Sequence, residues 1–254
     1  MKIGVQAYTV RDYCKTQDDI YVSLKKIKAM GFDMIQISGF GPHDVNTLDG
    51  WLKEIGIEVC SAHSPWDRFN DNSELLKMIS EYKKLGCTEM GLGSKPDSFP
   101  NTHEGWTRFI NKINSISKII KDNGLVFGYH NHAFEFQKFN GICAMDRIIE
   151  ECPDINIILD VFWVQTGGAN PSAYIDKCKD RINLLHLKDF RIVNNNRQYA
   201  EIGQGNLDWD DIIPRCQKYG IPYAVIEQDG DFMVDPFDSL AVSREYLVDK
   251  GFWK

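Results

Sequence analysis

The sequence predicts a (β/α)8 TIM barrel, in which eight parallel strands close into a ring and helices cover the outside. The chain has 254 residues, close to the roughly 250 that are typical of one such barrel. Short apolar runs recur eight times, about every 32 residues (254/8), the length of one strand plus one helix. We therefore expect a single barrel domain over residues 1–254. A doubly wound open sheet is the alternative, but no glycine-rich phosphate-binding turn follows the first run.

The predicted strands are the eight apolar runs, taken in chain order. They cover residues 3–7, 34–37, 57–62, 89–92, 125–129, 155–159, 182–187 and 223–226. Helical periodicity lies between them: residues 20–30 and 106–120 repeat apolar side chains every three or four positions. Strands that alternate with single helices predict a parallel sheet.

Residues typical of helix ends support the same division. Glycine stands where a left-handed residue would close a helix before the next strand, at Gly31, Gly56, Gly86, Gly124 and Gly220. Helix starts are indicated by capping residues or a first-turn proline, at Asn72-Ser73, Asn170-Pro171 and Asp208-Trp209. These signals indicate one regular strand–helix repeat along the chain.

Composition and charge restrict the function. The hydrophobic share of 43% and the charged share of 26% are ordinary for a globular enzyme. The formal net charge of −7 argues against nucleic acid as a partner. Seven scattered cysteines without a CxxC pair predict free thiols in a reducing compartment. Since we find no signal peptide and no apolar run of about 18 residues, we expect a cytoplasmic protein that does not enter a membrane.

Side chains that can bind a metal close the last four predicted strands. They are His130, Asp160, His186 and Glu227. Because the chemistry of a parallel barrel lies at the C-terminal ends of its strands, we expect the four to meet at one mouth. A mixed nitrogen and oxygen set suits Mn2+, Co2+, Zn2+ or Fe2+ better than Mg2+, which prefers oxygen ligands. We predict one divalent metal, Mn2+ first, with the other four ions as alternatives.

Each of these residues also has a structural interpretation. Asp160 could cap a following helix, but Pro171 predicts that the next helix starts about ten residues later. A lone His186 among leucines would be a core residue. Glu227 could form an ion pair with Lys188. The presence of all four side chains at strand ends favours the metal site.

The same loops supply candidates for proton transfer and substrate binding. The acids and bases that proton transfer next to a carbonyl requires are Glu227, His132 and Glu135. His132 lies two residues after His130, so both face one side if the strand continues, and a packed pair without function is the alternative. The candidate substrate-binding residues are His63, Trp66, Trp163, Lys188, Arg191 and Gln204. For these, a plain turn, a solvated loop or an aromatic lining of the mouth is the alternative.

Several segments at these positions resemble the sugar phosphate isomerase/epimerase family, whose members are barrels similar to xylose isomerase. The segments are GYHNHAFEF (128–136), LDVFWV (159–164), HLKD (186–189), IGQGNLDW (202–209), IEQ (226–228) and the opening IGVQAYT (3–9). The resemblance implies a metal held by Glu, Asp, His and Glu at the ends of strands five to eight. His130 stands where many ketose epimerases of the family carry the first glutamate, so either His130 or Glu135 is implied as that ligand.

The resemblance implies a divalent-metal-dependent sugar or sugar phosphate isomerase or epimerase. Such an enzyme abstracts a proton next to a metal-bound carbonyl to give an enediolate. The His-x-His pattern of strand five also resembles the inosose dehydratase branch, so a lyase or dehydratase acting on a keto-sugar or inosose is the first alternative. A non-catalytic sugar-binding barrel or subunit is the alternative of another class. The resemblance further implies a small sugar-like substrate and a homo-oligomer.

Overall fold

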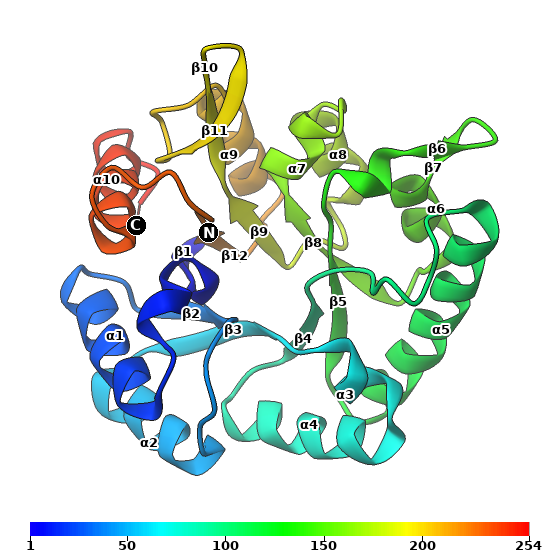
Figure 1. The fold of residues 1–254 in the computed structure, drawn as a ribbon, viewed down its shortest axis with the longest axis horizontal. Coiled ribbons are helices and arrows are strands. Elements are labelled where there is room, and N and C mark those ends of the chain that lie inside the picture. The colour runs from blue at the N-terminus through cyan, green and yellow to red at the C-terminus, as the bar shows by residue number, and fades with distance from the viewer. Residues whose placement is uncertain (254) are drawn as a thin grey trace.

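Eight strands close into a parallel barrel, which confirms the predicted fold (Figure 1). The computed structural model describes residues 1–253, and around the ring the strands follow the order β1-β12-β9-β8-β5-β4-β3-β2. Every neighbouring pair in this ring is parallel. The strands are β1 (Lys2–Gln6), β2 (Met34–Ile37), β3 (Glu58–His63), β4 (Glu89–Leu92), β5 (Val126–His130), β8 (Ile155–Asp160), β9 (Leu184–Leu187) and β12 (Tyr223–Ile226).

Helices form the outer ring in Figure 1. Their periodicity predicts the side that they bury: Ile20, Leu24 and Ile27 of α1 are buried against the barrel. Within residues 1–253, no helix combines the length and the hydropathy that a membrane-spanning helix requires. The helices are η1 (Ala7–Tyr13), α1 (Gln17–Ala29), α2 (Val45–Ile55), α3 (Trp66–Asn70), α4 (Asn72–Lys84), α5 (His103–Asp122), η2 (Phe134–Phe136), α6 (Ala144–Glu151), α7 (Val161–Thr166), α8 (Pro171–Cys178), α9 (Trp209–Lys218) and α10 (Pro236–Asp249).

The predicted helix ends lie close to the observed ones. All five glycines that the sequence places after helices have positive φ, between 68° and 89°. Asn170 and Asp208 cap α8 and α9 through their side chains, as predicted. The helix α4 begins at Asn72, but its cap comes from the preceding Asp71, whose carboxylate accepts two backbone N–H groups.

The loops after five strands depart from the predicted alternation of strands with single helices. Two helices in succession follow β1 (η1 and α1), β3 (α3 and α4) and β8 (α7 and α8). Two antiparallel hairpins follow β5 and β9: β6 (Lys138–Phe139) with β7 (Ile142–Cys143), and β10 (Asp189–Val193) with β11 (Asn196–Ala200). Their turns, Asn140-Gly141 and Asn194-Asn195, have positive φ, which suits two-residue hairpin turns. These insertions lengthen the loops around the barrel mouth.

An apolar layer fills the middle of the barrel and forms the floor of its mouth. A glycine on a neighbouring strand leaves room for it, because a Cβ atom on Gly128 would lie 2.8 Å from Cδ1 of Ile158. Since alternate residues of a strand point to the same side, the residue two positions after Met34, Ile158, Leu184 or Val225 faces the mouth. The register between β2 and β3 is irregular, and in β3 His63 lines the mouth while Ala62 packs in the apolar core. All seven cysteines of the chain are free, as predicted, and all seven are buried. The layer consists of Met34, Cys60, Ile158, Leu184 and Val225.

Candidate metal centre and active site

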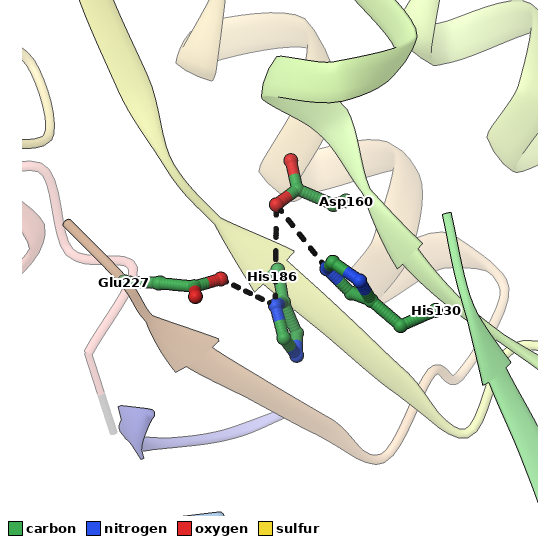
Figure 2. Close-up of side chains that lie close together, drawn as sticks. All are labelled: His130, Asp160, His186 and Glu227. Atoms are coloured by element: carbon green, nitrogen blue, oxygen red, sulfur yellow. Dashed lines mark hydrogen bonds and ion pairs between the residues drawn. The ribbon is translucent and has the colours of Figure 1, made fainter. Parts of the chain in front are cut away.

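Four side chains that can bind a metal meet at the mouth of the barrel, as Figure 2 shows. His130 ends β5, Asp160 ends β8, His186 lies in β9 and Glu227 follows β12. One potential ligand atom from each lies within 4.8 Å of those from the other three, and all four residues are buried. These are the four residues for which the sequence predicts a metal.

His130 presents a lone pair to this cluster. Its Nδ1 lies 2.9 Å from the carbonyl oxygen of Gly93, which can only accept, so Nδ1 carries the proton. In the neutral ring Nε2 is then an acceptor, and it is buried without a hydrogen-bond partner among the described residues. It faces Oδ2 of Asp160 at 3.4 Å, which is also buried and unpartnered within residues 1–253. Two acceptors therefore face each other with no donor between them.

The two carboxylate oxygens of Asp160 have different roles. Oδ1 accepts a 3.0 Å hydrogen bond from the backbone N–H of Trp163 and caps α7, which begins at the next residue. The expectation of a helix start only near Pro171 is therefore wrong, because this side-chain cap starts a short helix earlier. Oδ2 lies 4.0 Å from Nδ1 of His186. Asp160 thus caps a helix with one oxygen and belongs to the cluster with the other.

His186 lies between two acceptors. Its Nε2 is 2.6 Å from Oε1 of Gln36, and its Nδ1 is 2.7 Å from Oε2 of Glu227. A neutral imidazole has one N–H and can donate to only one of them. Burial lowers the pKa of His186 well below its usual value, so the ring does not hold a second proton at neutral pH. One of the two contacts therefore joins two lone pairs without a proton between them, and a bound cation would accept both.

The charges of the cluster fit a divalent ion. Burial raises the pKa of Asp160 to about 7 and lowers that of His130 to about 3, because it disfavours the charged form of each group. An ion bound by these residues, His186 and Glu227 would supply positive charge and accept the lone pairs that lack a donor. The unpartnered Nε2 of His130 and Oδ2 of Asp160 are the observation on which this fit rests.

Lys188 lies beside the cluster as a buried cation. Its Nζ is 2.5 Å from Oδ2 of Asp229, 3.7 Å from Oε1 of Glu227 and 4.0 Å from Oδ2 of Asp160. Burial on its own would lower the pKa of Lys188, but these three carboxylates outweigh it and raise the pKa. The predicted alternative for Glu227, a contact with Lys188, exists beside the shorter contact of Glu227 with His186.

A cavity of about 630 Å3 opens beside the cluster. Its volume lies in the range typical of small-molecule sites, about 300–1,000 Å3. The indole of Trp163 packs next to it, with its ring centroid 5.2 Å from that of His132. The lining includes six residues that the sequence singles out, namely His63, Trp66, His130, His132, Lys188 and Glu227.

Three predicted site residues lie elsewhere. Glu135 is fully buried; its Oε1 accepts from Oη of Tyr129 at 2.6 Å, and its Oε2 accepts from the backbone N–H of His132 at 2.9 Å. Glu135 therefore holds the His132 segment and is outside the four-residue cluster. Arg191 lies in β10 and Gln204 in the loop after β11, and neither is among the described residues that line the cavity.

The structure adds residues that the sequence analysis does not single out. Asn131 holds the backbone of Asp160 from both sides: its Oδ1 accepts from the Asp160 N–H at 2.9 Å, and its Nδ2 donates to the Asp160 carbonyl at 3.3 Å. Gln36 contacts His186 from behind. The available signals were the position of Asn131 between two histidines and the polar Gln36 inside an apolar strand.

Solved structures share the fold over nearly the whole chain. A sugar phosphate isomerase/epimerase from Parabacteroides distasonis is 22% identical, with a TM-score of 0.79 over 100% of this chain and 99% of that chain. The probable 3-DHS dehydratase AsbF from Bacillus anthracis is 14% identical, with a TM-score of 0.74 over 98% and 99%. The IOLI protein, solved with a zinc atom, is 14% identical, with a TM-score of 0.69 over 98% and 97%. At these identities the likeness shows the fold.

Sequence relatives and a family profile extend the comparison. An inosose dehydratase from Klebsiella pneumoniae is 22% identical over 258 residues, covering 85% of each chain. An inosose dehydratase from Clostridium beijerinckii is 20% identical over 267 residues, covering 91% of this chain and 89% of that chain. The profile of the family described as Xylose isomerase-like TIM barrel matches residues 24–231. That match spans most of the sequence of the closed barrel, and the chain therefore belongs to the Xylose isomerase-like TIM barrel family.

Proposed function

We propose that the protein is a divalent-metal-dependent enzyme that removes a proton next to the carbonyl of a small keto-sugar or keto-polyol and then eliminates water. The isomerase or epimerase reaction that the sequence analysis places first begins with the same proton abstraction. Elimination needs one group that takes a proton and returns it, whereas epimerisation needs one group on each face of the carbon. The acids and bases around the cavity favour elimination.

The proposed metal ligands are His130, Asp160, His186 and Glu227. A divalent metal bound there would polarise the substrate carbonyl and make the neighbouring C–H more acidic. We propose Mn2+ first, with Co2+, Zn2+, Fe2+ and Mg2+ as alternatives. The unpartnered lone pairs of the cluster support a metal, and the zinc atom of the IOLI protein supports this kind of site in the same fold.

Glu227 is the proposed base. Its Oε2 lies 2.7 Å from Nδ1 of His186, and its Oε1 lies 3.7 Å from Nζ of Lys188. Oε1 would take the proton from the substrate carbon, and the C–H electron pair would move into the enediolate. The ammonium group of Lys188 would stabilise the negative charge that develops on the enediolate oxygen.

One acid/base group is sufficient for the elimination step. After the first step Glu227 carries the abstracted proton and can return it to the β-hydroxyl on the same face of the substrate. The enediolate electron pair then forms a carbon–carbon double bond, the bond to the β-hydroxyl breaks, and water leaves. Atoms and charges balance without a second proton donor.

An epimerase would need a second acid facing Glu227 across the cavity. Around the ring of strands, β3 and β5 each lie three positions from β12, one in each direction. His63 ends β3, and His132 follows β5. Burial lowers the pKa of His132 to about 3, so it is a neutral imidazole and a weak acid at neutral pH. The lack of a carboxylate at the end of β5 is the observation that favours elimination, and the inosose dehydratases among the relatives support it.

Isomerisation or epimerisation is the second candidate, supported by the likeness to a protein named a sugar phosphate isomerase/epimerase. In either reaction we propose that His63, Trp66 and Lys188, which line the cavity, bind the substrate, with Trp163 beside them. His132 would then bind a substrate hydroxyl or serve as the second acid. Roles for Glu135 in proton transfer and for Arg191 and Gln204 in binding stay predictions.

Turnover in D2O separates the candidates. The metal-loaded protein is incubated with a keto-inositol and with ketohexoses, and the products are analysed by mass spectrometry. A product lighter by one water supports the dehydratase, whereas deuterium at carbon without loss of water supports the isomerase or epimerase. Binding of these compounds without either change would contradict both and support a sugar-binding barrel.

Glu227→Gln provides the control for the base. We expect the rate to fall about 100- to 10,000-fold, the usual contribution of a general base, with metal content checked in parallel. Glu150→Gln, which changes an exposed carboxylate of α6 that does not line the cavity, should keep the wild-type rate. Unchanged turnover in Glu227→Gln would show that another group takes the proton.

A further inference from the structure

Gln36, in β2, is fully buried among polar side chains at the mouth of the barrel. Its Oε1 lies 2.7 Å from Nε2 of Gln6 and 2.6 Å from Nε2 of His186. Its Nε2 lies 3.0 Å from Nε2 of His63. One amide thus contacts side chains from three other strands, and one of these side chains is a proposed metal ligand.

One backbone group determines the direction of these hydrogen bonds. The N–H of Tyr8 can only donate, and it donates to Oε1 of Gln6 at 3.2 Å. The other end of the Gln6 amide, Nε2, is a donor, so the Gln36 atom that it meets is an acceptor oxygen. His186 contacts the same oxygen and must donate to it as well. The NH2 group of Gln36 then donates to Nε2 of His63.

His186 consequently has a defined tautomer. In a neutral imidazole, a proton on Nε2 leaves the lone pair on Nδ1. Nδ1 is the atom that lies 2.7 Å from Oε2 of Glu227, inside the cluster. The carbonyl of Gly93 acts on His130 in the same way, by accepting from its Nδ1 at 2.9 Å. Each of the two imidazoles has an acceptor behind it that directs its lone pair into the cluster.

We propose that Gln36 is a positioning residue, which holds His186 as the Nε2–H tautomer so that His186 binds the metal through Nδ1. This inference rests on the metal site of the proposed function. Hydrogen-bond partners behind a metal-binding histidine fix its tautomer and ring orientation, and their loss costs about 10- to 100-fold in metal affinity. Without Gln36 the proton can move to Nδ1, where Glu227 accepts it, and the lone pair no longer faces the cluster.

The tautomer can be measured in the protein without metal. Histidine labelled with 15N is incorporated, metal is removed with a chelator, and long-range 1H–15N couplings are recorded at about pH 8. His186→Gln identifies the His186 signals by their loss. We expect the His186 proton on Nε2. A proton on Nδ1 in the wild type would overturn the proposal, whatever the enzyme's activity.

Co2+ affinity tests what the contact does. We expect Gln36→Leu, which removes the acceptor, to bind Co2+ about 10- to 100-fold more weakly, and Gln36→Glu, which keeps an acceptor, to bind at least as tightly as wild type. Ser61→Ala is the matched control, because it removes a buried hydroxyl at the β3 position paired with Gln36 and should leave the affinity unchanged. Equal affinities of Gln36→Leu and wild type would overturn the proposal.

The two experiments also separate this inference from the proposed function. If the wild type binds no Co2+, the proposed metal site fails, while the NMR result on the same protein still decides the tautomer of His186. If the wild type binds Co2+ and carries the His186 proton on Nδ1, the metal site stands and the role of Gln36 is refuted.

Discussion

Two buried carboxylates, Glu89 and Asp160, lie inside the barrel on opposite sides of its apolar middle layer. Glu89 begins β4 and Asp160 ends β8, so the first lies towards the N-terminal end of the barrel and the second at the mouth. Both are at most 1% exposed, and burial raises the pKa of each to about 7. The two groups are alike in burial and in pKa, and they differ in their neighbours.

The groups around Glu89 are uncharged, although its Oε1, like Oδ2 of Asp160, has no hydrogen-bond partner within residues 1–253. Its Oε2 accepts a 2.9 Å hydrogen bond from Nδ2 of Asn156. Against the larger effect of burial, the side chains of Asn156, Asn183 and Ser61 lower its pKa. One proton on the carboxyl makes this group neutral, so its surroundings call for no further cation.

The neighbours of Oδ2 of Asp160 are two acceptors and the ammonium group of Lys188, whose Nζ lies 4.0 Å away. This oxygen faces Nε2 of His130 at 3.4 Å and Nδ1 of His186 at 4.0 Å. A single proton can lie between two acceptors, whereas a metal ion accepts lone pairs from four at once. The comparison teaches that the neighbours of a buried carboxylate, and not its burial or its pKa, distinguish a structural group from a candidate metal ligand.

Removing the charge of Asp160 should give the largest effect. Asp160→Asn keeps an oxygen that can cap α7 and removes the anionic one, so we expect metal affinity to fall more than about 100-fold, beyond the loss typical of residues behind the ligands. Asp160→Ala should lose the metal equally and also about 1 kcal/mol of capping stability. Titration calorimetry with Co2+ and urea denaturation measure the two effects. Wild-type affinity in Asp160→Asn would make both carboxylates structural and break the comparison.

Glu89→Gln should change the pH dependence of stability and spare metal binding. The folded-state pKa is about 7 and the usual value is 4.5, so the folded protein holds this proton more tightly than the unfolded chain. The stability from this group is therefore complete below about pH 4.5 and is lost as the pH rises through about 7. The loss is roughly 3 kcal/mol, at about 1.4 kcal/mol per pH unit of difference.

Urea denaturation of wild type and Glu89→Gln at pH 5 and pH 8, with chelator present, measures this difference. From the lower to the higher pH, Glu89→Gln should gain stability relative to wild type, by up to about 3 kcal/mol. Glu150→Gln, which changes an exposed carboxylate of α6, is the control and should show no such gain. The same pH dependence of stability in wild type and Glu89→Gln would contradict the proposed protonation of Glu89.

Gly128→Ala should have the smallest effect of the three and tests the layer between the carboxylates. The new Cβ would lie 2.8 Å from Cδ1 of Ile158 and 3.1 Å from Cδ of Glu89, so we expect a loss of about 1–3 kcal/mol by overpacking. Adding Ile158→Val should restore part of it. Thermal unfolding of the single and double variants is the measurement, and no recovery in the double variant would refute this packing.

The fold could be predicted because its signals are local. Each strand is an apolar run, and each of the five glycines after a helix depends on its immediate neighbours in the chain. The four clustered residues could be predicted for a related reason. A parallel barrel brings the C-terminal ends of its strands to one mouth, so position along a strand was enough to group them.

The surroundings of the cluster depend on contacts between distant parts of the chain. Gln36 meets His186 from 150 residues away, and no local pattern joins the two. In the sequence Asp160 is a possible helix cap that Pro171 argues against, although Gly167 and Gly168 follow the short helix. The hydrogen bond from the Trp163 N–H to Oδ1 of Asp160 is seen only in the structure. The position of the Glu135 carboxylate depends on the 3-10 turn η2, which places it next to the hydroxyl group of Tyr129.

Metal content of the purified protein tests the central claim most directly. Elemental mass spectrometry is applied to wild type, His130→Ala and Glu135→Gln; the last change can keep hydrogen bonds to Tyr129 and to the His132 N–H. We expect about one Mn, Co, Zn or Fe per chain in wild type and Glu135→Gln, and loss of the metal in His130→Ala. Metal lost in Glu135→Gln and retained in His130→Ala, or no metal in wild type even after incubation with excess ion, would contradict the four-residue site.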